Sequence, residues 1–261
     1  MIISPAHGGS TTAYEFGDNV YLIVNEPASW TQAHANAEAA LGHLAIVTSE
    51  AENQFLYTNL LARGISTTAD DGGGARYAWL GGSDATLEGT WRWVDTNLLS
   101  SGYTKWGSGF WGSEPDDYNG AQDHLALGLE GWPTGAPGGF GNASEWNDVN
   151  GSNSLAYVIE YESPDLDTDE DGMPDWQEFI AATDPTNPTS VLQGNISLAA
   201  QNRVVVSWDG AEVCSYSVDT ATNLVQSNWI TITNAQGVNA LMTYTNNIPD
   251  IQRFYLIHAE R

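Results

Sequence analysis

Residues 106–148 decide the fold of this chain, and they read WGSGFWGSEPDDYNGAQDHLALGLEGWPTGAPGGFGNASEWND. Carboxylates and amides lie here among glycines and aromatic rings, with little helical or strand periodicity. An irregular stretch of this length inside a compact domain is usually functional. Calcium takes about six to eight hard oxygen ligands from Asp, Glu, Asn, backbone and water. We therefore interpret the stretch as a calcium site whose open face binds a sugar.

The composition limits what the protein can bind. The chain has 261 residues, 41% of them hydrophobic, and its 7 Lys+Arg against 33 Asp+Glu give a net charge of −26. This length predicts about two domains. So negative a chain repels nucleic acid and anionic membranes, and bound calcium is the simplest way to offset part of its charge. We expect no nucleic-acid partner.

Membrane insertion is not expected either, because no run of about 18 apolar residues occurs. The first residues lack the basic and apolar regions of a signal peptide, so either an export signal has been removed or the protein is not exported by that route. Cys214 is the one cysteine, so an internal disulfide is impossible.

Strands and two capped helices surround the irregular stretch. Residues 14–28 predict a strand pair. Capping-box pairs predict helices from Ser29 to about Ala40 and from Ser49 to Gly64. Further short strands are expected at 44–47, 77–82, 91–94 and 155–161.

In the order and spacing of these elements, residues 14–161 resemble a C-type lectin-like domain. The matching motifs are Ala78-Trp79-Leu80-Gly81, Trp91-x-Trp93, Glu114-Pro115-Asp116, Trp146-Asn147-Asp148 and Val158-Ile159-Glu160. The match extends over about 150 residues and is far more specific than any single motif. The resemblance implies an α+β fold with a long calcium-bearing loop region, over a domain at 1–161.

The resemblance also implies two calcium sites. The sugar-binding calcium would take Glu114, Asp116, Asn147 and Asp148, and the second calcium would take Asp84, Glu88, Asp117 and Asp123. The family's further acidic ligand of both sites falls on Gln122, which is neutral and lowers the charge of the ligand set. Tyr118 falls where galactose binders of the family place a stacking aromatic ring, and the hybrid Glu-Pro-Asp motif with Tyr118 favours galactose-type ligands.

The resemblance also shows which cysteines this chain lacks, and the tryptophans can be assigned to the core or to the surface. The family's cysteines fall near His124, Gly151 and Ile159, so packing has to replace bridges that typically stabilise by about 2–4 kcal/mol. We expect core positions for Trp30, Trp79, Trp91 and Trp93, and surface positions for Trp106, Trp111 and Trp132.

An acidic connector at 162–189 contains a second metal motif. Residues 167–178 read DTDEDGMPDWQE, which fits the EF-hand calcium loop in spacing. The oxygen ligands would come from Asp167, Asp169, Asp171, the Met173 carbonyl, Asp175 and Glu178. Because no amphipathic helix precedes it, the loop resembles the single calcium loops of thrombospondin type 3 repeats and dockerins. We expect this calcium to stiffen a connector between domains.

The tail at 190–261 predicts a small β-sandwich. Six short runs of strand-forming residues alternate with turn signals. It looks like the fibronectin-III-like or Ig-like modules at the ends of many bacterial surface proteins.

Three classes of function can be weighed against these patterns. The first is a calcium-dependent carbohydrate-binding module of an exported, bacterial-type protein, located outside the cell or at its surface. The alternative is a domain of the same fold that displays residues 98–151 to a protein surface. An enzyme is not expected, because no Ser/His/Asp set, Cys/His pair or zinc spacing stands out.

Overall fold

The computed structural model describes residues 11–200, 202–223, 229–247 and 252–261. It divides into two compact units, residues 13–164 and residues 165–261, with residues 11 and 12 joined to the second. We describe each unit by itself. The predicted connector does not form a separate body, since its residues from 165 onward belong to the second unit.

The first unit contains one mixed sheet. Its strand order is β1-β2-β8-β4-β6-β7, with β3 paired to β8 and β5 paired to β4. The strands are β1 (Thr11–Phe16), β2 (Asn19–Ala28), β3 (His43–Leu44), β4 (Tyr77–Ser83), β5 (Arg92–Trp93), β6 (His124–Gly128), β7 (Trp146–Val149) and β8 (Leu155–Tyr161). The β4–β8 pair is parallel, and the β2–β8, β3–β8, β4–β5, β4–β6 and β6–β7 pairs are antiparallel. Two predicted strands are shorter than expected, since β3 and β5 contain two residues each.

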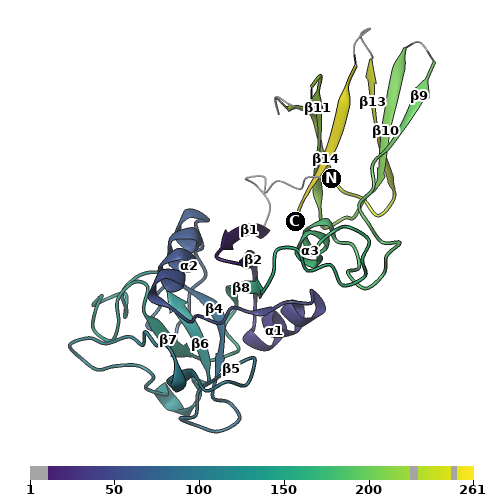
Figure 1. The fold of residues 1–261 in the computed structure, drawn as a ribbon. Coiled ribbons are helices and arrows are strands. Elements are labelled where there is room, and N and C mark those ends of the chain that lie inside the picture. Colours follow the sequence, from purple (N-terminus) through teal and green to yellow (C-terminus); the bar gives the residue numbers. More distant parts are fainter. Residues whose placement is uncertain (1–10, 201, 224–228, 248–251) are drawn as a thin grey trace. The chain divides into compact units, whose positions relative to one another are not determined.

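Two helices flank this sheet, α1 (Trp30–Ala39) and α2 (Glu50–Ala62) (Figure 1). Both predicted caps are confirmed, because the Ser29 and Ser49 hydroxyls accept backbone N–H groups at 3.3 and 3.2 Å. Side chains of a strand alternate between faces. Tyr21 and Ile23 of β2 therefore share a core cluster with Leu56 and other side chains of α2.

The irregular stretch runs along β6 and β7 without long elements of its own. Outside the two strands it holds only the 3-10 turn η2 (Tyr118–Gly120), and the turn η1 (Leu99–Ser101) precedes it. Trp146 anchors it from beneath, because this buried ring packs edge-on against Trp93 and Trp106 and donates its N–H to Asn53 at 2.7 Å. The loop is thus held at the end of the sheet that carries β7.

His124 and Gly151, two of the positions near which the family resemblance implies cysteines, lie side by side. A Cβ added to Gly151 would lie 2.6 Å from two atoms of the His124 ring, and that ring also packs against Trp30 with centroids 4.6 Å apart. The His124 ring, tilted against Trp30, therefore fills the space between these two positions.

The second unit contains two three-stranded sheets, β13-β10-β9 and β12-β11-β14. All six tail strands predicted from the sequence are present. They are β9 (Asn195–Ala199), β10 (Arg203–Asp209), β11 (Ser215–Ala221), β12 (Ile230–Gln236), β13 (Leu241–Asn247) and β14 (Phe254–Glu260). Val206 and Trp208 of one sheet share a core cluster with Tyr216 and Ile257 of the other.

The acidic loop is built into this same core. Met173 is 5% exposed and packs with Leu192 and the sheet residues, and α3 (Asp175–Ala181) follows it directly. Cys214 donates its thiol to the Ile180 carbonyl at 3.4 Å, which ties α3 to the sheet cluster. The Cys214 side chain is buried, as its apolar character predicts.

Within the described residues, none of the helices has the length and apolar character needed to cross a membrane.

Candidate calcium and ligand site

Three groups of carboxylates gather in the described part of the chain. In each group, oxygen atoms from different residues lie within 4.8 Å of one another. The groups are Glu114–Asp116–Asp148, Asp84–Glu88–Asp123 and Asp167–Asp169–Asp171. All nine residues belong to the ligand sets that the sequence predicts. The tertiary structure brings together side chains as distant in sequence as Asp84 and Asp123, which are 39 positions apart.

Glu114 is the central residue of the first group. It is 8% exposed, and the Trp132 indole N–H donates to its Oε1 at 2.7 Å. Its Oε2 is buried and has no hydrogen-bond partner among the described residues. Buried polar atoms are almost always paired, so this oxygen needs a metal ion or a proton.

The electrostatics of Glu114 lead to the same requirement. The pKa of its carboxyl is raised to about 8, mainly by burial; the Trp132 hydrogen bond lowers it, whereas the charges of Asp116 and Asp148 and a side-chain hydrogen bond with Asp148 contribute to the rise. Burial also raises the pKa of Asp148 to about 6. A cation among these carboxylates would remove the penalty for ionising them.

Asp148 positions the backbone of the preceding loop. Its two oxygens accept the backbone N–H groups of Asp116 and Asp117 at 3.2 and 2.8 Å. The Glu114–Pro115 peptide just before them is cis. Asp116 itself is exposed, and one of its oxygens accepts the Tyr118 N–H at 3.1 Å.

Gln122 is engaged in a different network. Its carbonyl oxygen accepts the Tyr118 N–H at 2.6 Å, and its amide donates to the Asp71 carbonyl and carboxylate at 3.1 and 3.3 Å. Asp71 also accepts from Asn150 and Asn153. Gln122 therefore bridges two loops through Asp71, a partner that the sequence analysis did not find.

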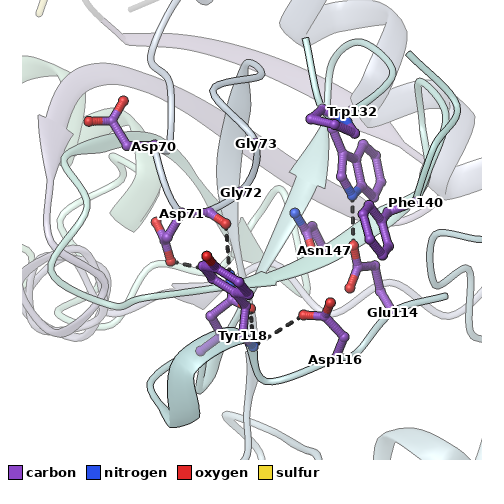
Figure 2. Close-up of a pocket in the computed structure, with 12 residues that line it drawn as sticks. Asp70, Asp71, Gly72, Gly73, Glu114, Asp116, Tyr118, Trp132, Phe140 and Asn147 are labelled. Atoms are coloured by element: carbon purple, nitrogen blue, oxygen red, sulfur yellow. Dashed lines mark hydrogen bonds between the residues drawn. The ribbon is translucent and has the colours of Figure 1, made fainter. Parts of the chain in front are cut away.

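A pocket of about 250 Å³ opens over this first group. Figure 2 shows the Glu114, Asp116 and Asn147 side chains at one wall, with Phe140 and Trp132 beside Glu114 and the Asp70–Gly73 loop opposite. The Asn147 amide donates to the Tyr77 hydroxyl at 2.9 Å, which leaves its oxygen available to a metal. Tyr118, 57% exposed, lies at the rim, and none of the described residues lining this pocket is Lys, Arg or His.

The second group lies at the β4 end, and none of its members lines this pocket. Asp84 is 2% exposed, its Oδ2 accepts the Gly89 N–H at 2.8 Å, and its Oδ1 is unpaired within the described chain. Burial raises its pKa to about 6, with added repulsion from Glu88 and Asp123. Asp117 is not among the carboxylates grouped here, and its Oδ1 accepts the Gln122 N–H at 3.2 Å.

The third group is the acidic loop of the second unit. One oxygen of Asp167, Asp169 and Asp171 accepts the N–H of Gly172, Asp171 and Met173, respectively, at 2.8, 3.2 and 2.8 Å. The other oxygen of each carboxylate is buried and lacks a partner among the residues described. Gly172 has φ +94°, a conformation that favours glycine at the sharp turn of such a loop.

The two remaining acids of the loop differ from each other. Glu178 is fully buried, one oxygen accepts the Thr183 hydroxyl at 3.1 Å, and Oε2 is unpaired in the described structure. Asp175 instead accepts the Thr168 N–H and hydroxyl at 2.8 and 2.7 Å, one with each oxygen. Asp175 thus braces the loop rather than offering a free oxygen.

Of the tryptophans expected at the surface, Trp111 is 56% exposed, whereas Trp132 is 2% exposed and its predicted position was wrong. Trp106, also expected at the surface, is partly buried against the core. Of the rings expected in the core, Trp30 is partly buried and the others are buried. The many glycines around Trp132 were the available signal, because residues without a side chain leave room for a large ring beside them.

Comparison with known proteins bears on the first unit. A family model described as "Lectin C-type domain" matches residues 26–160. C-type lectin domain family 4 member M of Hylobates lar is 28% identical over 117 residues, 45% of this chain and 26% of that protein. Ladderlectin of Oncorhynchus mykiss is 27% identical over 142 residues, 54% of this chain and 62% of that protein. This chain therefore spans about a quarter of the first relative's length and less than two thirds of the second's.

The solved structures that this chain resembles have sequence identities in a similar range. The C-type lectin CEL-I from Cucumaria echinata is 27% identical with a TM-score of 0.41, over 57% of this chain and 93% of that one. A mouse scavenger receptor C-type lectin carbohydrate-recognition domain is 21% identical with a TM-score of 0.45, over 59% and 96%. The family match covers more than half of the 261 residues and assigns a binding domain rather than an enzyme. This chain belongs to the C-type lectin domain family.

Proposed function

We propose that the first unit is a calcium-dependent carbohydrate-binding module, and that its ligand site is the pocket over Glu114, Asp116, Asn147 and Asp148. The observation that carries this proposal is the buried, unpaired Oε2 of Glu114 beside the other carboxylates. Calcium fits this donor set, because every ligand atom that these side chains offer is a hard oxygen. Bound calcium would supply open coordination positions for two neighbouring sugar hydroxyls.

The residues around the metal position supply the rest of the recognition. Asp116 is exposed and can accept a hydrogen bond from a sugar hydroxyl. Tyr118 offers an exposed ring at the rim, which suits the apolar face of a galactose-type sugar. The acids Asp70 and Asp71, with no cationic side chain among the described lining residues, favour neutral sugars over anionic ones.

The other two groups are proposed as structural calcium sites. Asp84, Glu88 and Asp123 would hold one ion in the first unit, and the loop at 167–178 would hold one in the second. Each group contains a buried carboxylate oxygen without a partner in the described structure. We also propose that the protein is located outside the cell or at its surface. Extracellular calcium modules bind calcium with a Kd of about 10⁻⁴–10⁻³ M.

We keep the predicted division into lectin domain, acidic loop and small β-sandwich as part of this proposal, with the loop belonging to the sandwich unit. The packing of Met173 among the sandwich core residues supports that assignment. The fibronectin-III-like or Ig-like character of the sandwich stays a prediction.

Calorimetric titration tests the main proposal. Calcium is titrated into metal-free protein, and a panel of neutral monosaccharides and oligosaccharides is then titrated in calcium and in a chelator. Glu114→Gln should abolish calcium-dependent sugar binding, whereas Glu15→Gln, the same change at an exposed position of β1, should leave it intact. Sugar binding that needs no calcium, or none at all across the panel, would contradict the proposal.

A protein-binding display domain is the second candidate, and one observation favours it. Phe110 and Trp111 are 70% and 56% exposed, their rings pack at 5.1 Å, and Trp111 also packs against Phe140 at 6.0 Å. Exposed aromatic clusters are typical of protein interfaces. Binding to a protein partner that persists in a chelator and in Glu114→Gln, but is lost in Trp111→Ala, would favour this function.

A further inference from the structure

We infer that Trp132 is a positioning residue that reserves one oxygen of Glu114 for the protein and turns the other toward the metal, so that the ligand's hydroxyls pair on the Asp116 side of the site. This inference rests on the proposed function and adds a determinant of its selectivity. The structural basis is the 2.7 Å hydrogen bond from the Trp132 indole N–H to Glu114 Oε1 (Figure 2).

Trp132 is held rigidly in this position. It is 2% exposed, and a Cβ at Gly107, Gly128 or Gly141 would overlap atoms of its six-membered ring. Its backbone is fixed as well, since the backbone N–H of Trp132 donates to the Gly141 carbonyl at 3.0 Å. The glycines therefore form a flat slot that only a planar ring fills, and the slot sets where the indole nitrogen points.

The chemistry of the two partners defines the consequence. An indole nitrogen can only donate a hydrogen bond, and a carboxylate can only accept one. The buried Trp132 N–H occupies one of the two lone-pair directions of Oε1, and the 8% exposure of Glu114 limits the access of a sugar hydroxyl to the other. Oε2, unpaired among the residues described, is left for the cation.

The hydroxyl groups of the ligand must then find their acceptor elsewhere. Asp116 is the exposed carboxylate of the group, and one of its oxygens is committed to the Tyr118 N–H. The Phe140 ring lies beside Glu114 and limits approach from the Trp132 side (Figure 2). The geometry thus makes recognition asymmetric, with Asp116 as the main acceptor and Glu114 as a metal ligand.

The test separates the N–H from the shape of the ring. Trp132→Phe removes the donor and part of the ring, while benzothienylalanine at position 132 keeps the bicyclic shape and replaces only the N–H by sulfur. Trp111→Phe is the control, because Trp111 lies in the same loop region and makes no hydrogen bond to Glu114 among the described contacts. Calcium affinity without sugar, the order of affinities across the sugar panel at saturating calcium, and the thermal unfolding temperature are measured for each.

Loss of the N–H should weaken calcium binding by about tenfold or more, the usual effect of removing a group that orients a metal ligand. It should also change the order of affinities across the sugar panel, because Oε1 becomes open to a hydroxyl. Benzothienylalanine should reproduce both effects with little change in unfolding temperature, whereas Trp111→Phe should show neither.

Two results would overturn the inference. If benzothienylalanine at 132 matches the wild type in calcium affinity and in sugar order, Trp132 acts through packing alone. If Asp116→Asn leaves the sugar order unchanged, Asp116 is not the main acceptor. A wild type that binds no calcium or no sugar would instead reject the proposed function itself, which keeps the two failures distinct.

Discussion

Gln122 donates its side-chain amide to Asp71, with the nitrogen 3.1 Å from the Asp71 carbonyl oxygen and 3.3 Å from its carboxylate. At this position the family resemblance implies an acidic calcium ligand. The amide is 2% exposed and its oxygen accepts the Tyr118 N–H. The neutral residue thus joins the Asp71 loop to the Tyr118 loop, which a carboxylate beside Asp71 could not do without repulsion.

Gln122→Glu should therefore have opposite effects with and without metal. In a chelator it should lower the free energy of unfolding by about 1–3 kcal/mol, because a buried donor is lost and two carboxylates face each other. In calcium the added charge should raise metal affinity. Urea unfolding and calcium calorimetry check this, and Asp71→Asn combined with Gln122→Glu should recover the loss in chelator. An equally stable metal-free variant would contradict the expectation.

Calcium should stabilise the second unit through the loop at 167–178. Met173 follows the grouped Asp residues and its side chain lies in the core of this unit. Metal binding to the folded loop would raise the free energy of unfolding by about 2.7 kcal/mol at 100 times Kd.

The readout is the calcium dependence of this unit's unfolding transition, followed by calorimetry of the whole chain. Asp169→Asn and Glu178→Gln should remove the stabilisation, and Glu170→Gln, an exposed loop residue outside the group, should not. A transition of this unit that is insensitive to calcium would exclude the coupling.

Without metal, the stability of the first unit should fall as pH rises. The pKa of Glu114 is about 8 in the folded unit, above its ordinary value of about 4.5. Between these values the folded state binds more protons than the unfolded state, so the free energy of unfolding decreases with pH. Calcium should remove this loss, so the stabilisation that it provides should grow up to about pH 8.

Unfolding of wild type and Glu114→Gln in chelator, compared from pH 4.5 to 8.5, isolates the contribution of this carboxyl. Their difference in stability should shift steadily in favour of the variant as pH rises, while Glu15→Gln should follow the wild type. A difference that is constant with pH would refute the assignment of the raised pKa.

His124 and Gly151 should accept an engineered disulfide. A Cβ at Gly151 lies 2.6 Å from atoms of the His124 ring, so the two side-chain positions face each other. His124→Cys combined with Gly151→Cys should oxidise and raise the free energy of unfolding by about 2–4 kcal/mol relative to the reduced form. Thiol titration and thermal unfolding under both conditions report this, with His124→Cys alone as control. Failure to form the bridge would show that the backbones are too far apart.

Local patterns were enough to predict much of this protein. The helices starting after Ser29 and Ser49, the tail strands, and the spacing of acids from Asp167 to Asp171 depend on residues within a few positions of each other. Such features follow from caps, alternation and loop geometry, which act along the chain. The motifs at Glu114 and Asn147 were also recognisable, because their order along the chain is itself the signal.

The tertiary structure decided what those side chains do. Trp132 lies 18 positions from Glu114, and only the path of the glycine-containing loop brings its N–H to the carboxylate. Asp175 fits a ligand position by spacing, and the fold adds hydrogen bonds from Thr168 to both of its oxygens. The acidic loop reads as a linker by composition, but Met173 carries it into the core of the second unit. Burial and hydrogen-bond pairing depend on the surrounding atoms in space, and spacing along the sequence does not encode them.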